Sequence, residues 1–367
     1  MRVWVEIDVD NLLHNIHQIK RLSGDKEIIS VIKANCYGLG AVEMSRILEK
    51  NGINFFGVAT LEEAQELRKN NIKSKILILG SLFEDELLEC KGKDFHVTIS
   101  TMEHLTFLVK NSINIKVQLK IDTGMGRLGF LPSEIEAAYN YCIKNNIYIS
   151  GIYSHLNDAD VETSEAKEYT INQIEKFIKF KDYNVDYFHI LNSGGISRYS
   201  DRFSGNAVRP GICMYGLLGD KKIDGFKSVV TMKSKVMYKR IIEEETAVSY
   251  GRTATLKKGE TLATVAVGYA DGLCRDFSNK MYFIIKGEKC PVIGNICMDM
   301  CIVRLPETIA SDVAIEDEVI VYNDEIIKDI TAETKCSWEM LTGIGRRVYR
   351  VYLRNKKAYK TLRWISE

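Results

Sequence analysis

The sequence predicts an α/β protein with two domains, an N-terminal (β/α)8 TIM barrel followed by a mostly β C-terminal domain. Three observations support this fold class. The chain has 367 residues, too many for one ordinary hydrophobic core. Short β-rich apolar runs alternate with amphipathic stretches up to about residue 210. After Gly219 the helical periodicity fades, and short apolar runs follow one another directly.

Eight apolar runs in the first part of the chain have the length and composition of buried strands. They are Ile28–Ile32, Phe55–Val58, Ile76–Leu79, Phe95–Ile99, Lys116–Ile121, Ile147–Tyr153, Tyr187–Leu191 and Asn206–Val208. Helical patterns such as Leu61–Lys69 and Glu134–Lys144 lie between them, with apolar residues three and four positions apart. Alternating β and α units predict a parallel sheet, and eight such units predict a closed barrel.

The second part of the chain carries short runs separated by turn residues such as Lys258-Gly259-Glu260 and Lys286-Gly287-Glu288, which is typical of an antiparallel β domain. The runs are Val229–Met237, Thr261–Val267, Tyr282–Ile285, Cys290–Ile293, Cys301–Arg304 and Glu318–Val321. We expect one helix near Ser337–Leu341, and we expect Met1–Ile7 to pair with this domain. The predicted division falls near residue 230, so that the barrel covers residues 1–230 and the β-rich domain covers residues 231–367.

Composition limits the partners and the compartment. Lys and Arg number 50 against 49 Asp and Glu, without a basic stripe, so we expect no nucleic-acid partner. No run approaches the roughly 20 apolar residues of a membrane span, and the charged N-terminus lacks a signal-peptide core, so we expect a cytoplasmic protein. Nine cysteines without a CxxC pair indicate free thiols. The closest group, Cys290, Cys297 and Cys301, has no histidine beside it, so we expect no metal site.

Polar residues follow the ends of several predicted barrel strands. Since the carboxyl ends of barrel strands meet at one mouth, where the chemistry of this fold takes place, we expect these residues to converge. They are Lys33, Lys120, Arg127, His155, Ser193 and Arg209, and Gly194 and Gly211 lie close to the last two in sequence. Apart from Asp122, no carboxylate competes with these cationic and hydroxyl groups.

Each of these residues also has a structural explanation. Lys33 could be a solvated rim lysine, His155 a hydrogen-bonded core histidine, and Arg127 with Asp122 a structural ion pair. Their convergence favours an anion site instead. Ser193 and the N–H groups around Gly194 and Gly211 resemble a phosphate cradle. A lysine, a phosphate cradle and an arginine together predict pyridoxal 5′-phosphate (PLP) held as a Schiff base, with the cation at the pyridine nitrogen.

Six sequence blocks in order resemble those of the alanine racemase family, and the resemblance covers essentially the whole chain. The blocks are VIKANCYGLG at 31–40, LKIDTGMGRLG at 119–129, VRPGICMYG at 208–216, VSYGRT at 248–253, GYADG at 268–272 and ICMD at 296–299. The resemblance implies a PLP-dependent racemase that interconverts L-alanine and D-alanine, a route to D-alanine for the peptidoglycan precursor, and it implies a homodimer with shared active sites.

The resemblance also implies roles for the barrel residues. Lys33 would form the Schiff base, and Arg209 would face the pyridine nitrogen. His155 would lie beside the cofactor ring, and Arg127 would support the phenolate and the substrate carboxylate. Tyr37, Ser193, Gly211 and Ile212 would hold the phosphate. Lys120 matches a lysine that is often carbamylated in the family; a simple ion pair with Asp122 is the alternative.

In the second domain the resemblance implies that Tyr250 is the second acid/base, and that Tyr269 and Met298 contact the substrate, with Tyr250 and Met298 reaching the other subunit's site. Racemisation removes the α-proton from one face and returns it on the other. Two opposed groups, Lys33 and Tyr250, achieve this without motion, because each is the base for one enantiomer and the acid for the other. Free lysine has a pKa near 10.4 and free tyrosine near 10, so we expect the neighbours of Lys33 and of Tyr250 to lower the pKa of each group.

Three positions depart from the family's common pattern and leave the substrate open. Asn295 stands where the family's block has arginine, and Met300 stands where glutamine is frequent. Arg346 stands where a tyrosine often contacts the phosphate. Serine, or a broader range of amino acids, therefore remains an alternative to alanine. A PLP-dependent decarboxylase with the same barrel and a PLP-binding protein without enzymatic activity are further alternatives. Whether the role is biosynthetic, catabolic or linked to spores also remains open.

Overall fold

The computed structural model describes residues 1–218, 221–222, 224–334 and 337–363. Their contacts gather into two compact units. One unit is Asn15–Met214, and the other combines Met1–His14 with the described residues of Tyr215–Glu367. A domain boundary at residue 230 stays a prediction. We call the first the barrel unit and the second the β unit.

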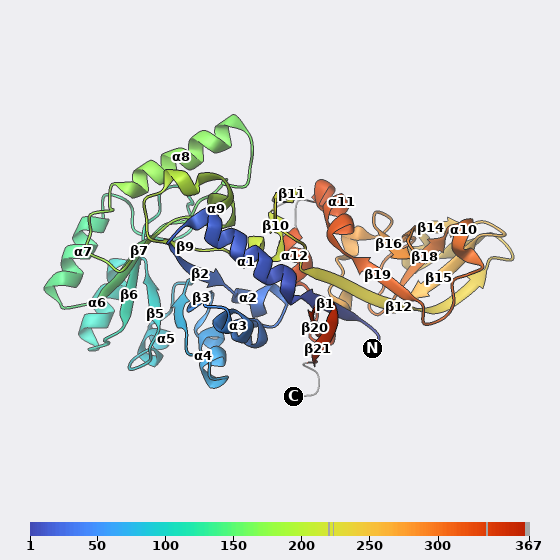
Figure 1. Ribbon diagram of the computed structural model, residues 1–367, viewed down its shortest axis with the longest axis horizontal. Coiled ribbons are helices and arrows are strands. Elements are labelled where there is room, and N and C mark those ends of the chain that lie inside the picture. Colours follow the sequence, from blue (N-terminus) through green and yellow to red (C-terminus); the bar gives the residue numbers. More distant parts are fainter. Residues whose placement is uncertain (219–220, 223, 335–336, 364–367) are drawn as a thin grey trace. The chain divides into compact units, whose positions relative to one another are not determined.

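The barrel unit is built on eight parallel strands in the order β8-β7-β6-β5-β4-β3-β2-β9 (Figure 1). The strands are β2 Glu27–Val31, β3 Phe55–Val58, β4 Lys75–Ile78, β5 His96–Ile99, β6 Lys116–Lys120, β7 Ile149–Tyr153, β8 Tyr187–His189 and β9 Ala207–Val208. Backbone bonds from Asn206 to Phe188 (3.1 Å) and from Arg209 to Leu191 (2.9 Å) join the two ends of this order. The predicted barrel is confirmed, and each predicted strand corresponds to one of the eight.

Helices connect these strands, and in Figure 1 helices such as α6, α7 and α8 lie around the outside of the sheet. The helices are α1 Val9–Ser23, α2 Lys33–Tyr37, α3 Ala41–Lys50, α4 Leu61–Lys69, α5 Glu84–Glu89, α6 Met102–Lys110, α7 Ile135–Lys144, α8 Ser164–Ile178 and α9 Ser193–Tyr199. Thr60, Thr101 and Thr163 begin α4, α6 and α8, and each side chain accepts a backbone N–H of the first turn.

The barrel interior is richest in buried polar groups towards the carboxyl ends of its strands. Ile29, Phe55, Leu77 and Ala207 form a buried apolar cluster, and the buried His96 ring packs on Phe55. On β6, on β8 and directly after β9, the side chains of Gln118, Lys120, His189 and Arg209 are buried, although all are polar or charged. Buried polar groups are costly unless they are hydrogen-bonded, so their concentration near the carboxyl ends of the strands marks a functional region.

The β unit contains a nine-stranded sheet. Its strands are β1 Trp4–Asp8, β12 Val230–Ile241, β15 Thr261–Val265, β16 Tyr282–Ile285, β17 Glu288–Pro291, β18 Cys301–Leu305, β19 Glu318–Tyr322, β20 Tyr349–Arg354 and β21 Lys357–Leu362. Strand β1 pairs antiparallel with β12 and parallel with β20, which confirms that the N-terminal stretch joins this part of the chain.

Two hairpins and three helices complete the β unit. They are β10 Leu217–Leu218 with β11 Lys221–Lys222, β13 Thr246–Val248 with β14 Ala254–Leu256, α10 Glu307–Ala310, α11 Asp324–Thr334 and α12 Ser337–Thr342. The mostly β character and the helix near residue 337 are confirmed. The sequence reasoning missed the strands β10, β11, β13, β14, β20 and β21 and the helices α10 and α11.

Candidate active site

Lys33 follows β2 and begins a turn with an unusual backbone. The next four residues, Ala34 to Tyr37, all have positive φ angles of 51° to 56°. Left-handed backbone costs roughly 1–2 kcal/mol for each such residue, so the surrounding structure must hold it in place. Glu63 on α4 does so, since its two carboxylate oxygens accept the N–H groups of Ala34 (2.6 Å) and Ala59 (2.7 Å). The sequence reasoning missed Glu63, because nothing local links it to Lys33.

The surroundings of Lys33 favour its neutral amine. Burial lowers the pKa of Lys33, the positive charge of Arg127 lowers it further, and only Glu63 opposes them. The expected direction of this shift is therefore confirmed. A lysine with a lowered pKa has a larger fraction of free amine near neutral pH, which nucleophilic and base catalysis both require.

Arg209, directly after β9, is the most firmly held residue of the mouth. Its guanidinium is 3% exposed and donates to the carbonyls of Ser154 (2.6 Å) and Ile190 (3.1 Å). It also contacts Nδ1 of His189 at 2.5 Å and Nδ1 of His155 at 3.2 Å. Burial lowers the pKa of Arg209 to about 10, so it remains a fixed cation at neutral pH.

Both histidines beside Arg209 are neutral. Burial, followed by the charge of Arg209, lowers the pKa of His155 and of His189 well below the ordinary histidine value. Nε2 of His189 lies 2.8 Å from Oε1 of Gln118, which can only accept, so His189 donates there and presents an unprotonated Nδ1 to Arg209. The sequence reasoning found His155 and missed His189, which the strand pattern alone does not distinguish from a core residue.

Lys120 at the end of β6 is 3% exposed. Its Nζ donates to the carbonyl of Ile121 (3.0 Å) and lies 5.3 Å from the ring centre of Tyr153. Burial, then the charge of Arg209, lowers the pKa of Lys120 to about 7.

The alternative prediction that Asp122 forms an ion pair with Lys120 or Arg127 is wrong. Among the described residues no carboxylate lies within ion-pair distance of Lys120 or Arg127. The Asp122 carboxylate instead accepts the backbone N–H groups of Gly124, Met125 and Gly126 at 2.8, 2.8 and 3.1 Å. Arg127 is exposed, and it makes no side-chain hydrogen bond to the described part of the chain. The mouth therefore holds more positive charge than its own carboxylates neutralise.

Ser193, Gly211 and Tyr37 lie together on one side of the mouth. The Ser193 hydroxyl accepts the N–H groups of Gly211 (3.1 Å) and Cys213 (3.3 Å). A Cβ at Gly211 would lie 2.5 Å from the Tyr37 hydroxyl, and a Cβ at Gly194 would lie 2.7 Å from the backbone of Ala159. Only glycine allows these approaches. Ile212, buried, opens the following 3-10 turn.

Tyr250, Tyr269 and Met298 belong to the β unit, on loops that contact one another through their backbones. The N–H of Tyr269 donates to Cys297 O, and the N–H of Ala270 donates to Met298 O, both at 3.0 Å. All three side chains are exposed, by 71%, 42% and 52% respectively. The structure thus places the predicted residues in two sets, one in each unit.

Arg347 holds two of these loops. Its guanidinium donates to Asp271 (2.6 Å) and pairs with Asp299 (2.7 Å), which follow Tyr269 and Met298 in sequence. The sequence reasoning singled out the neighbouring Arg346, whose side chain is exposed and contacts no described residue through a hydrogen bond or ion pair. Arg347 had no distinguishing signal, because its partners lie far away in the sequence.

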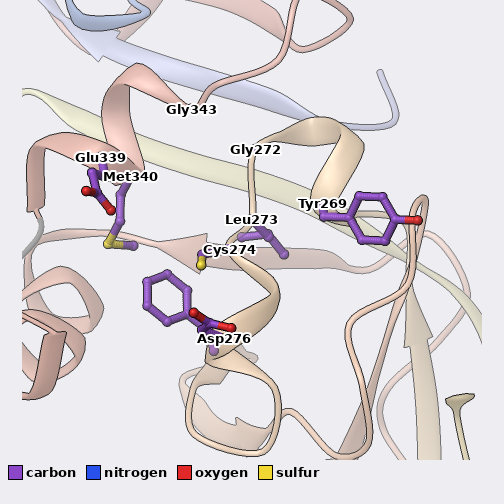
Figure 2. A pocket seen from close by; sticks show the side chains of 9 residues that line it. Tyr269, Gly272, Leu273, Cys274, Asp276, Glu339, Met340 and Gly343 are labelled. Carbon is purple, nitrogen blue, oxygen red and sulfur yellow. The ribbon is translucent and has the colours of Figure 1, made fainter. Parts of the chain in front are cut away.

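Figure 2 shows a cavity of about 480 Å³ in the β unit, behind the turn that carries Tyr269. Leu273, Phe277 and Met340 form its apolar wall, and Cys274, Asp276 and Glu339 supply exposed polar groups. The Tyr269 ring points away from Cys274 and Met340. Of the predicted site residues only Tyr269 lines this cavity, so it is separate from the other predicted groups.

Comparisons with known proteins fit both units. Residues 7–219 match the family description "Alanine racemase, N-terminal domain", and residues 229–352 match "Alanine racemase, C-terminal domain". The chain belongs to the alanine racemase family. It is 46% identical over 352 residues to an alanine racemase of Fusobacterium nucleatum, covering 96% of this chain and 99% of that protein.

Solved structures in this family superimpose on the whole fold. The alanine racemase of Clostridium difficile 630 has a TM-score of 0.89 and 32% identity, covering 100% of this chain and 99% of that one. The alanine racemase of Bartonella henselae, described with covalently bound pyridoxal phosphate, has a TM-score of 0.86 and 28% identity, covering 96% and 100%. Within the described residues, no helix is both long and apolar enough to cross a bilayer.

Proposed function

We propose that this chain interconverts L-alanine and D-alanine with PLP as its cofactor. The observation that carries the proposal is the composition of the barrel mouth. Lys33, whose pKa is lowered, lies there among basic side chains that the carboxylates of the mouth do not neutralise. Relatives of this sequence that are named alanine racemases match it over nearly its full length, which supports alanine as the substrate.

The residues of the mouth fit PLP. The cofactor is an anion with a phosphate, an aldehyde and a pyridine ring, and the mouth offers a group for each. Ser193, Gly211, Ile212 and Tyr37 would hold the phosphate, where glycine keeps the space beside the Tyr37 hydroxyl open. Lys33 would bind the aldehyde carbon. When bound, PLP withdraws electrons from the substrate Cα and so acidifies the hydrogen on that carbon.

Lys33 and Tyr250 would transfer the proton. The lowered pKa of Lys33 leaves its amine free to accept a proton near neutral pH. Tyr250, supplied by a partner subunit, would serve the opposite face as the second acid/base. Arg127 would bind the substrate carboxylate, because its guanidinium is exposed and free of carboxylate partners within the described chain.

Arg209 would keep the pyridine nitrogen unprotonated. Its carbonyl partners Ser154 and Ile190 and the two neutral histidines fix its donors in place, and a pKa of about 10 keeps it charged. A permanent cation facing the nitrogen disfavours a second positive charge there. This arrangement limits delocalisation of negative charge into the ring, and so limits transamination.

Lys120 is a proposed site of carbamylation. A buried lysine with a pKa of about 7 is largely a neutral amine at slightly alkaline pH, the form that reacts with carbon dioxide. The product would be an anion beside Arg209 and Arg127, whose charges now disfavour the ammonium. That anion would orient Arg127 towards the substrate.

We also propose a homodimer. Tyr250, Tyr269 and Met298 are large, exposed side chains on loops fixed by backbone bonds, and exposed apolar groups held in this way are typical of a surface that another subunit covers. A twofold dimer would let each β unit complete the site of the other subunit.

A side-by-side assay tests the proposal. L-alanine and L-serine are incubated with the purified PLP-loaded protein and with Tyr250→Phe, and both enantiomers are quantified by chiral chromatography. We expect alanine to exceed serine at least tenfold in kcat/KM, about 1.4 kcal/mol in transition-state binding, and Tyr250→Phe to lose about a hundredfold. If kcat/KM for serine equals or exceeds that for alanine, alanine is not the preferred substrate. A fully active Tyr250→Phe would overturn the two-base assignment.

A further inference from the structure

Tyr250 is carried by a turn whose strands do not join the main sheet. The turn connects β13 to β14, and these two strands pair only with each other among the described strands. Val248 on β13 and Leu256 on β14 pack in a small apolar cluster with Leu262 and Ile302 of the main sheet. This cluster holds the two strands but, as described, includes no residue of the turn at 249–252, the tip of the hairpin. The orientation of the tip therefore depends on further contacts that attach it to a neighbouring segment.

The backbone of this tip is strained as well. Ser249, Gly251 and Arg252 have φ angles of 64°, 74° and 51°. Two of these residues are not glycine, and left-handed backbone at such residues costs of order 1–3 kcal/mol each and persists only where surrounding contacts enforce it. The Tyr250 side chain supplies none of these contacts: it is 71% exposed and forms no hydrogen bond within the described chain.

Asn295 provides the attachment. Its Nδ2 donates to the backbone carbonyl of Tyr250 at 2.7 Å. In return, the Ser249 hydroxyl donates to the backbone carbonyl of Asn295 at 2.5 Å. Two hydrogen bonds of opposite direction thus connect the tip to the segment at residue 295. They hold the Tyr250 carbonyl and the side chain of the preceding residue, so they restrict the path of the backbone that carries the phenol.

The segment that carries Asn295 is itself rigid. The N–H of Gly294 donates to Asn279 (2.6 Å), the N–H of Ile296 donates to Ser278 (3.0 Å), and the N–H of Ile293 donates to Ile302 O on β18 (2.9 Å). Gly294 has φ 74°, and a Cβ there would lie 2.6 Å from Cβ of Ser249. Glycine at position 294 therefore allows the segment at 293–296 to lie close to the turn at 249–252.

From this geometry we propose that Asn295 is a positioning residue, which aligns Tyr250 for proton transfer through the Tyr250 backbone carbonyl. The inference rests on the proposed function of Tyr250 as an acid/base and deepens it. It also gives a role to one of the three positions where the sequence departs from the family pattern. A neutral amide makes this bond, so the attachment adds no charge beside the phenol.

The test uses the PLP-loaded dimer with Asn295→Asp, which has the same shape and places an acceptor against the Tyr250 carbonyl. Asn279→Asp is the matched control, because it makes the same chemical change nearby and retains the acceptor for Gly294. The other partner of Asn279 is the Thr253 hydroxyl, which can turn to donate to the new carboxylate. Three quantities are measured: kcat/KM with each enantiomer, the primary deuterium isotope effect with each α-deuterated enantiomer, and amide hydrogen exchange of residues 249–253. Tyr250→Phe serves as reference, because its larger isotope effect identifies the enantiomer whose proton Tyr250 removes.

We expect Asn295→Asp to lower kcat/KM about tenfold, the loss of one positioning hydrogen bond. The isotope effect should rise only with the enantiomer that Tyr250→Phe identifies, exchange at 249–253 should accelerate, and PLP affinity should stay unchanged, while Asn279→Asp resembles wild type. Kinetics within twofold of wild type, isotope effects that rise equally for both enantiomers, or weakened PLP binding would overturn the inference. If Tyr250→Phe is itself fully active, the proposed function fails first and this inference fails with it.

Discussion

The barrel mouth and the loops of the β unit hold their predicted functional groups in different ways. At the mouth, Arg209 and Lys120 are buried and fixed through their side chains. In the β unit, Tyr250 and Met298 are exposed, and only their backbones are fixed. Burial shifts the pKa values at the mouth, whereas the loops control only position. In the proposed dimer, the barrel unit would set the electrostatics of the site and the β unit would supply groups to a second subunit.

The largest effect should come from the mouth. With the proposed roles, Lys33→Ala would remove both the attachment for PLP and one of the two bases, so we expect kcat to fall by at least about 10³-fold. The loss should exceed that of Tyr250→Phe, because Tyr250 would provide proton transfer alone. Racemisation rates and the absorbance of bound cofactor measure the two roles separately. A Lys33→Ala protein with more than a tenth of wild-type activity would contradict the assignment.

A smaller effect should follow from filling the phosphate cradle. A Cβ in Gly211→Ala would lie 2.5 Å from the Tyr37 hydroxyl and displace it. We expect PLP affinity to fall about tenfold, which corresponds to one lost hydrogen bond. Equilibrium titration of the apoprotein with PLP measures this change. Gly24→Ala is the control for general backbone strain, because its φ of 62° disfavours alanine while the new Cβ would meet nothing within 4 Å. Unchanged PLP affinity in Gly211→Ala would place the phosphate elsewhere.

The remaining prediction concerns stability and its dependence on pH rather than activity. The native pKa of Lys120 is lowered to about 7, whereas an unfolded lysine titrates near 10.4. Between these values the unfolded chain binds the additional proton, so wild type should gain stability relative to Lys120→Met as pH rises from 7 to 10. The slope should reach up to about 1.4 kcal/mol per pH unit. Urea unfolding in bicarbonate-free buffer measures it, and parallel curves for the two proteins would mean that Lys120 is not a buried amine.

Much of this organisation could be predicted from the sequence, because it depends on local patterns. The alternation of apolar runs and amphipathic stretches predicts the eight barrel strands, and the residues after each run identify Lys33, His155 and Arg209. Strand β9 is the shortest of the barrel, with two residues, and its run was correspondingly short in the sequence. The family blocks identify Tyr250, Tyr269 and Met298 without any knowledge of their surroundings.

The contacts that hold these groups could not be predicted, because they join distant segments. Glu63 lies 29 residues from Ala34, and Arg347 lies 76 residues from Asp271. Neither carries a local signal that distinguishes it from a surface charge. The hairpin of β13 and β14 was missed because each strand has only three residues. Strand β20 carries buried and charged residues together, including the fully enclosed Arg350, so its apolar periodicity is weak.

Mixing two inactive variants tests the central claim, that the two units complete one site across a dimer, most directly. Lys33→Ala and Tyr250→Phe homodimers are each assayed, then dissociated, mixed in equal amounts and reassociated. Random reassociation makes roughly half of all dimers heterodimers. If each site takes Lys33 from one subunit and Tyr250 from the other, every heterodimer contains one wild-type site, and activity should recover to roughly a quarter of wild type. Activity that stays at the level of the separate variants would contradict a shared site.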